Sequence, residues 1–267
     1  MIRIAKPEVF LVGQTVINVP GLTAYLAKTG NLEFLETIAE ARAEGLGDME
    51  VLSSFFAKLC YRSLTSGKND NVSKMRSIRD NIIGTIESGH GSVFEHAVLN
   101  FVLSDVSRVL THELVRHRVS VAYSQESGRY CRLSPTNTGI YIPPEIAGNP
   151  EAEVLFVNAA EQALVTVAQL YDAFGIDEFN FHTKKQLTSA IRRIAPTGIA
   201  NEIGFSVNLR AVRHIITMRT NRGAEREIRL VFGQLANIVK DICPLLFHGG
   251  ECVDVDGLPE WTFPKHL

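Results

Sequence analysis

The sequence predicts an α+β protein in which a central, mostly antiparallel sheet is flanked by helices. Apolar residues recur with helical spacing in several segments, whereas only a few short segments have the β-branched and aromatic content of strands. These strands do not alternate regularly with the helices, which argues against a doubly wound sheet. The chain has 267 residues, 45% of them hydrophobic, and can bury a substantial core. We find no repeat and no convincing linker, and expect residues 1–267 to form a single domain.

The N-terminal part is predicted to contain two strands separated by three helices. The apolar run Val9–Val12 suits a short strand, and residues 97–103 (AVLNFVL) suit a second. The helices are expected at residues 21–28, 48–63 and 72–89, the last ending at Gly89 in a C-cap position.

A further helix is expected directly after the second strand. Ser104 and Asp105 offer an N-cap there. The residues that share one face of this helix are Val106, Val109, Leu110 and Leu114. This spacing predicts a helix that runs to about His117.

The C-terminal half is predicted to be mainly helical. Residues 136–150 hold three prolines and two glycines and are expected to be a loop. Helices are expected at residues 151–174, 183–193, 211–220 and 224–242, with a strand at 205–209. Pro196 stops the second of these helices, and the stripe of the last one consists of Ile228, Phe232, Leu235, Val239 and Ile242. The tail from Cys243 onward is rich in proline and glycine.

Charge and composition exclude several classes of partner. The net charge of −2 argues against general binding of nucleic acid. No apolar run approaches the roughly 20 residues of a membrane helix, and no signal peptide opens the chain. The four cysteines are scattered without a C-x-x-C pair, as in a reduced protein. We therefore expect a cytoplasmic protein that binds neither nucleic acid nor membrane.

The most informative segment is residues 116–130 (RHRVSVAYSQESGRY). It holds three arginines, a histidine and three serines, and follows an apolar-periodic segment. The planar fork of arginine suits phosphate and carboxylate groups, which it can bind bidentately. The segment therefore predicts an anion site, most simply for a phosphorylated ligand.

The helix before this segment carries an acid and an imidazole on its apolar face. Glu113 and His117 are four residues apart, so their side chains can meet, and each needs a partner, either the other or a ligand. The arginines on both sides favour a ligand. His112 and His117 are five residues apart and point about 140° apart on a helix, so the H-E-x-x-H zinc pattern is not matched and no metal is expected.

Three other clusters have the composition of a site, although each also has a purely structural interpretation. Residues 89–96 (GHGSVFEH) place small residues around His90, which a capped loop would also do. Arg192 and Arg193 precede Pro196, and Arg219 ends a helix whose other arginines suit a solvated face. Nucleotide-binding glycine motifs, a serine-hydrolase elbow and a nucleophilic cysteine context are absent. If the protein is an enzyme, a bound cofactor is expected to supply its chemistry.

Taken together, these clusters resemble the flavin-dependent thymidylate synthases. Arg116-His117-Arg118 and residues 127–130 (SGRY) match the two ends of that family's hallmark motif. Residues 90–96, 192–196 and 207–210 match three further family segments, and Arg219 lies where a late arginine does, all in the family's order. The resemblance implies the thymidylate synthase-complementing fold and conversion of dUMP to dTMP. Methylenetetrahydrofolate would be the carbon donor, and NAD(P)H the reductant, acting through FAD.

The resemblance also implies roles for individual residues. The catalytic residues would be Arg219, which polarises the pyrimidine, and His90, near the flavin and folate. The residues implied to hold dUMP are Glu113, Arg116, Gln125, Ser127, Gly128, Arg129, Arg192 and Arg219. Those implied to contact FAD are Ser92, Arg116, His117, Arg118, Gln125, Asn208 and His214. Family members are homotetramers whose flavin sites draw on several subunits.

The chain departs from the family pattern at four places. Eight residues separate Arg118 from Ser127 instead of seven, so a bulge is expected there. Gly223 replaces a flavin-binding histidine, His214 an asparagine, and Glu113 a glutamine that would face the nucleotide. Two alternatives follow: a related flavin-dependent C5-methylase acting on UMP in nucleoside-antibiotic biosynthesis, and a non-catalytic nucleotide-binding homologue.

Overall fold

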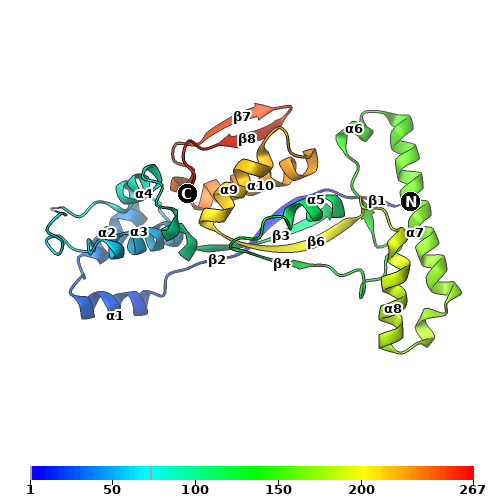
Figure 1. The fold of residues 1–267 in the computed structure, drawn as a ribbon, viewed down its shortest axis with the longest axis horizontal. Coiled ribbons are helices and arrows are strands. Elements are labelled where there is room, and N and C mark those ends of the chain that lie inside the picture. The colour runs from blue at the N-terminus through cyan, green and yellow to red at the C-terminus, as the bar shows by residue number, and fades with distance from the viewer. Residues whose placement is uncertain (1, 73) are drawn as a thin grey trace. The chain divides into compact units, whose positions relative to one another are not determined.

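A computed structural model describes residues 2–72 and 74–267 and confirms the predicted α+β class. Its main sheet is antiparallel and four-stranded, with the strand order β2-β3-β6-β4 (Figure 1). These strands are β2 (Glu8–Gln14), β3 (Val98–Ser107), β4 (Val121–Gln125) and β6 (Ala200–Asn208). The short strands β1 (Arg3–Ile4) and β5 (Gly139–Ile140) pair in parallel, and β7 (Glu251–Val255) and β8 (Leu258–Thr262) form an antiparallel hairpin.

The helices agree with the predicted ones in most places. The N-terminal helices are α1 (Val19–Thr29), α2 (Phe34–Ala43), α3 (Asp48–Cys60) and α4 (Ile78–Glu87). The helices that follow are α5 (Arg108–Leu114), α6 (Pro144–Ala147), α7 (Pro150–Ala173), α8 (Phe181–Ile191), α9 (Leu209–Thr220) and α10 (Arg226–Ile242).

Several details of the prediction were wrong. The helix expected from residue 72 begins at Ile78, because Ser77 caps it by accepting a 3.0 Å hydrogen bond from the Asp80 N–H. Ser73, inside that predicted helix, lies outside the described residues. Helix α2 was not predicted, and the expected loop 136–150 contains β5 and α6. The tail after Cys243 forms the β7–β8 hairpin.

The helix predicted from Ser104 to His117 is only half as long as expected. Ser104 and Asp105 do not cap it, because the Ser104 hydroxyl (2.9 Å) and the Asp105 N–H (3.2 Å) donate to Glu202. The strand therefore continues to Ser107, whose hydroxyl accepts from the Leu110 N–H at 3.1 Å and caps α5. The helix ends at Leu114, so that the RHR residues follow it as a turn and coil.

The chain divides into two compact units, each assembled from several segments. Unit 1 consists of Met1–Phe10, Phe101–Arg118 and Ala122–Phe205. Unit 2 consists of Leu11–Asn100, Val119–Val121 and Ser206–Leu267. Whether residues 1–267 behave as the single domain expected from the sequence stays a prediction.

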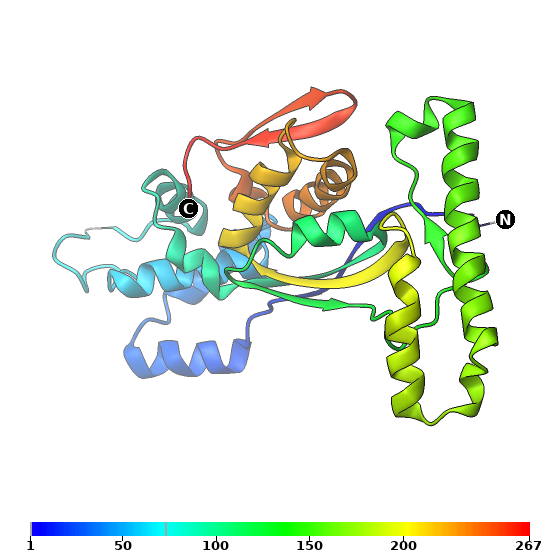
Figure 2. The same cartoon turned by 45° about the vertical axis from the view of Figure 1, so that its right-hand side comes forward.

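The core of unit 1 lies along one face of α7, which packs beside α8 (Figure 2). Ala160, Leu164, Val167 and Tyr171 recur every three or four residues and are buried there. Within the part of the chain described, α7 is also the one helix that is long and apolar enough to cross a membrane. Length and composition alone do not separate a membrane-spanning helix from a core helix.

The core of unit 2 is built around α9 and α10, which pack against each other and against strand β8 (Figure 1). The predicted stripe of α10 is confirmed, since Ile228, Phe232, Leu235 and Val239 are completely buried. In the other part of this unit α3 packs on α4, and the 3₁₀ segment Gly91–His96 contacts both α3 and α9.

The charge pair between Arg3 and Asp105 in unit 1 makes a testable contribution to stability. This residue has a left-handed backbone (φ 57°), and its carboxylate accepts hydrogen bonds from both terminal nitrogens of Arg3. Those bonds hold the pKa of Asp105 below its ordinary value. Asparagine tolerates the same backbone, so Asp105→Asn should remove the charge alone. We expect it to lower the free energy of unfolding by about 1 kcal/mol at pH 7.

The pH dependence gives the control for this variant. A carboxylate whose folded pKa is depressed stabilises the protein above its unfolded pKa of about 3.9 and loses that effect as the pH falls. The difference between wild type and variant in urea unfolding should therefore shrink below about pH 4. A difference independent of pH would contradict the role given to the Arg3–Asp105 pair.

Candidate functional site

The centre of the candidate site in unit 1 is Gly128, which two arginines approach closely. A methyl group placed on this buried glycine would lie 3.2 Å from Cδ of Arg192 and 3.6 Å from Nη2 of Arg108. Gly128 lies in a turn whose backbone is closed by hydrogen bonds from the Tyr130 (2.9 Å) and Cys131 (3.0 Å) N–H groups to the Ser127 carbonyl. In the structure Arg192 therefore lies beside Gly128 in the segment 127–130, and binding of an anion there stays a prediction.

Arg108 is a member of this cluster that sequence reasoning missed. It was overlooked because the predicted helix placed it inside a continuous helix and not at its first residue. Burial and the neighbouring charge of Arg192 lower the pKa of Arg108, an effect that Glu126 partly offsets. Two cations held together in a half-buried place favour a bound anion, because an anion relieves their repulsion.

The neighbours of Arg108 hold it in place. Asn201 is buried, and its side-chain amide is oriented so that the oxygen faces Arg108 and accepts a hydrogen bond from Nη2 at 3.1 Å. Gln125, at the end of β4, donates a 3.0 Å hydrogen bond to the hydroxyl of Thr111 one turn along α5. The predicted ligands Gln125 and Ser127 therefore lie in the same unit as the arginine pair.

The RHR residues Arg116, His117 and Arg118 follow α5, and hydrogen bonds from a tyrosine hydroxyl hold their backbone in place. The Tyr123 hydroxyl lies 2.9 Å from the Leu114 carbonyl and 2.8 Å from the His117 carbonyl and donates to them, which fixes the turn. Arg116 and Arg118 are exposed, and His117 is half-buried. Because His117 lies beyond the end of α5, the prediction that it shares a helix face with Glu113 was wrong.

The chemistry of this donor set fits an anionic dinucleotide such as FAD. Arg116 and Arg118 supply two guanidinium groups within three residues, and arginine binds phosphate oxygens bidentately. The chain between Arg118 and Ser127, which is one residue longer than the family spacing, contains a left-handed residue, Ser120 (φ 58°).

In unit 2 the predicted His90 cluster borders a cavity of about 380 Å³. The residues that line this cavity are Ala57, Cys60, Tyr61, Thr85, Gly89, His90, Gly91, Ser92, Val93 and Arg210. His90 and Ser92 are both exposed at it. Arg210 pairs with Glu95 at 2.5 Å and donates from Nε to the Leu267 backbone oxygen at 2.8 Å. The cavity therefore combines an imidazole, a hydroxyl and a cation.

The remaining predicted residues lie on α9 in unit 2. Asn208 caps this helix, because its side-chain oxygen accepts a 2.8 Å hydrogen bond from the Ala211 N–H. Capping uses one of the two lone pairs of this oxygen. His214 is exposed, and Arg219 lies half-buried in the last turn.

The structure thus distributes the predicted site over both units. Unit 1 holds the residues Glu113, Arg116, His117, Arg118, Gln125, Ser127, Gly128, Arg129 and Arg192. Unit 2 holds His90, Ser92, Asn208, His214 and Arg219. Within the described ranges no group of three or more His, Cys, Asp or Glu side chains has an arrangement that could hold a metal ion.

The structure shows an α+β protein in which two arginines meet beside the buried Gly128. Residues 45–245 match the family described as thymidylate synthase complementing protein. The chain belongs to this family.

Comparison with individual proteins agrees with the family. The chain is 30% identical to a flavin-dependent thymidylate synthase of Mycobacterium avium (strain 104) over 218 residues, 80% of this chain and 84% of the relative. It is 33% identical to the enzyme of that name from Nitratidesulfovibrio vulgaris over 182 residues, covering 67% and 71% of the two chains. The crystal structure of a UMP/dUMP methylase, PolB, from Streptomyces cacaoi has the same fold. Its TM-score is 0.60 at 17% identity, over 93% of this chain and 96% of that one.

Removing one arginine of the pair should weaken nucleotide binding. We expect Arg108→Ala and Arg192→Ala each to raise the dissociation constant for dUMP by about 10- to 100-fold, since a hydrogen bond to a charged group contributes about 1.5–3 kcal/mol. Isothermal titration calorimetry of the purified variants measures this change.

Arg193→Ala is the matched control for these variants. Arg193 follows Arg192 directly but is exposed, so its removal alters net charge equally without touching the Gly128 turn. Its dissociation constant for dUMP should stay within about twofold of wild type. Equal losses in Arg192→Ala and Arg193→Ala would show that the arginines act only through general charge.

Proposed function

We propose that this protein is a flavin-dependent thymidylate synthase that methylates dUMP to dTMP. The observation that carries the proposal is the approach of Arg108 and Arg192 to Gly128 inside the SGRY turn. That arrangement offers a phosphate two guanidinium groups and the hydroxyl of Ser127. The names of the relatives and the match of residues 45–245 to the family support flavin dependence and methyl transfer.

The contacts to the phosphate, sugar and base of dUMP that follow are assigned to side chains of unit 1. Arg108, Arg192, Ser127 and Arg129 would hold the phosphate, because three of them are cationic and all four flank or approach the Gly128 turn. Gln125 and Glu113 would face the sugar or base. Arg116 would contact both the nucleotide and the flavin.

The FAD site is assigned to the RHR residues together with Ser92, Gln125, Asn208 and His214. Arg116 and Arg118 are exposed guanidinium groups suited to the pyrophosphate. When bound, FAD supplies hydride transfer between NAD(P)H and the pyrimidine, together with transfer of the methylene group.

The reaction exchanges the C5 hydrogen of dUMP for a methyl group. The methylene carbon of methylenetetrahydrofolate forms a bond to C5 and the C5 proton is lost. The bonds from this carbon to the folate nitrogens break and release tetrahydrofolate, and a hydride equivalent from NAD(P)H, which becomes NAD(P)⁺, completes the methyl group. Arg219 would stabilise the negative charge that develops on the pyrimidine oxygen as C5 becomes nucleophilic. His90, at the cavity in unit 2, would orient the folate or the flavin ring.

Three of the four cysteines fit a mechanism without a thiolate nucleophile. Burial raises the pKa of the thiols of Cys131 and Cys252, and raises that of the buried Cys243 strongly. A raised pKa keeps a thiol protonated at neutral pH, whereas a nucleophilic cysteine needs the thiolate.

A homotetramer is part of the proposal. Its support is the resemblance to a family of homotetramers, together with exposed apolar side chains on α7, such as Val154 (58%) and Leu155 (65%). Exposed apolar residues of this kind are typical of surfaces covered by another chain.

The first test is the visible absorption spectrum of the purified protein. We expect an oxidised flavin spectrum that shifts when dUMP is added, because the proposed nucleotide and flavin sites share Arg116. Titration with UMP under the same conditions tests the related C5-methylase; PolB is named a UMP/dUMP methylase. Stronger binding and turnover of UMP than of dUMP would favour that alternative. A protein that binds dUMP but takes up no FAD would be a non-catalytic homologue.

The role of Arg219 has its own test. Arg219→Ala should leave a folded protein that still carries flavin, with methyl transfer reduced by about 100-fold or more, a loss typical of removing one donor to a developing oxyanion. Formation of dTMP, followed by chromatography in a single turnover, measures it. Normal turnover in this variant would refute the role. Exposed Arg193→Ala, loaded with FAD in parallel, controls for loss of positive charge.

A further inference from the structure

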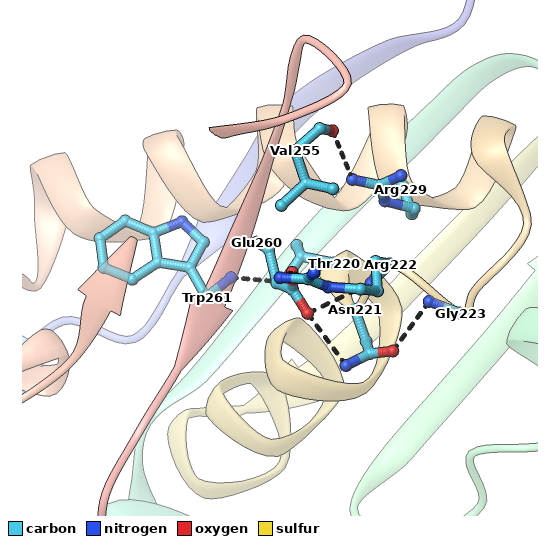
Figure 3. A network of polar contacts seen from close by, with 8 residues as sticks. All are labelled: Thr220, Asn221, Arg222, Gly223, Arg229, Val255, Glu260 and Trp261. Carbon is cyan, nitrogen blue, oxygen red and sulfur yellow. Dashed lines mark hydrogen bonds and ion pairs between the residues drawn. The ribbon is translucent and has the colours of Figure 1, made fainter. Parts of the chain in front are cut away.

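A buried carboxylate on the C-terminal hairpin holds the turn that follows Arg219 (Figure 3). Glu260 lies on strand β8, and only 5% of it is exposed. The turn runs from Thr220, the last residue of α9, to Gly223, and it lies in the connection to α10. The hairpin lies beyond residues 45–245, so it is outside the part matched by the family.

Glu260 accepts three hydrogen bonds from two consecutive residues of this turn. Oε1 accepts from Nδ2 of Asn221 at 3.1 Å and from the backbone N–H of Arg222 at 3.3 Å. Oε2 accepts from Nε of Arg222 at 2.9 Å and forms an ion pair with Nη2 of the same side chain, also at 2.9 Å. Because Glu260 binds both the backbone and the guanidinium group of Arg222, it fixes the orientation of this residue as well as its distance.

The residues next to Glu260 and Asn221 add hydrogen bonds to the same network, which we call the clamp. The backbone N–H of Trp261 donates to the hydroxyl of Thr220 at 2.9 Å, and that hydroxyl donates to the Ile216 carbonyl at 2.8 Å. On the other side, the side-chain oxygen of Asn221 accepts from the Gly223 N–H at 2.9 Å. Every residue from 220 to 223 therefore takes part in a hydrogen bond of this network (Figure 3).

Docking of the hairpin alone does not require this charge. The hairpin is also held by Arg229, which donates to the Val255 carbonyl at 2.8 Å, and by Arg226, which donates to the Asp256 carbonyl at 3.1 Å. Glu260 is buried whereas the side chain of Arg222 is 65% exposed, so the cost of desolvation falls mainly on the carboxylate and offsets part of what the ion pair contributes. What such a pair adds is a defined geometry for the backbone it holds.

We propose that Glu260 is a positioning residue that fixes the last turn of α9 and so aims Arg219 at the pyrimidine. This inference rests on the proposed function. Thr220, the neighbour of Arg219, is completely buried, and its hydroxyl is bonded to strand β8, so the backbone after Arg219 cannot shift without breaking the clamp. Gly223 stands where the resemblance expects a flavin-binding histidine, and a glycine leaves this turn more freedom. The clamp supplies the rigidity that the glycine removes.

The test compares Glu260→Gln with Glu251→Gln in the flavin-loaded protein. Glutamine keeps the shape and the acceptor for Asn221 but removes the charge that binds Arg222. Glu251 is an exposed carboxylate of the same hairpin and is the matched control. We expect Glu260→Gln to raise the dissociation constant for dUMP, read from the flavin spectrum, by about five- to tenfold. The flavin content and the affinity for inorganic phosphate should stay within twofold, and Glu251→Gln should match wild type in all three.

A double-mutant cycle separates positioning from a general loss of structure. In an Arg219→Ala background, Glu260→Gln should change dUMP binding by less than twofold, because the side chain it positions is gone. An equal loss in both backgrounds, or a parallel loss of phosphate binding, would overturn the proposal, and so would an unchanged Glu260→Gln. If Glu260→Gln does not fold, Arg222→Gln removes the same ion pair from the other side and carries the same comparison. A wild-type protein that binds neither FAD nor dUMP would instead refute the proposed function itself.

Discussion

The repulsion between the guanidinium groups of Arg108 and Arg192 is the constraint on which the arrangement of the candidate site in unit 1 depends. Two like charges stay close together only when their positions are fixed by structure that is stable without them. Arg108 is fixed because strand β3 passes directly into α5 at Ser107, whose hydroxyl caps the helix. Arg192 is fixed because α8 ends there and continues as a short 3₁₀ turn.

Gly128 makes this arrangement useful for binding. The absence of a side chain lets both arginines approach the backbone of the turn, and the turn itself presents Ser127 and Arg129. The site is therefore organised before any ligand binds, and a bound phosphate removes a repulsion that folding has already imposed. Preorganised charge of this kind is effective in binding and catalysis because little rearrangement opposes it.

In unit 2 a different interaction holds the backbone beside the candidate-site arginine Arg219. There the charge is a buried carboxylate, and the three hydrogen bonds that Glu260 accepts, together with its ion pair to Arg222, compensate for its removal from water. In both units an arginine of the candidate site lies at the end of a helix, where the backbone is least constrained by the helix itself. Hydrogen bonds from outside the helix supply the missing constraint, from Asn201 at Arg108 and from the hairpin at the residues after Arg219.

The sequence by itself determined the α+β class and most helices, because helical periodicity is a local property. Its arginine composition predicts an anion site at residues 116–130. The resemblance proposed Arg192, Gln125 and residues 127–129 as ligands, and these lie in one unit. It could not find Arg108, the short length of α5 or the role of Glu260. Each of these depends on contacts between residues far apart in the chain: Ser104 with Glu202, Arg108 with Asn201, and Glu260 with Arg222. Only the tertiary structure decides such pairs, because a polar side chain chooses among many partners of similar strength, and burial selects the one that leaves no polar atom unpaired.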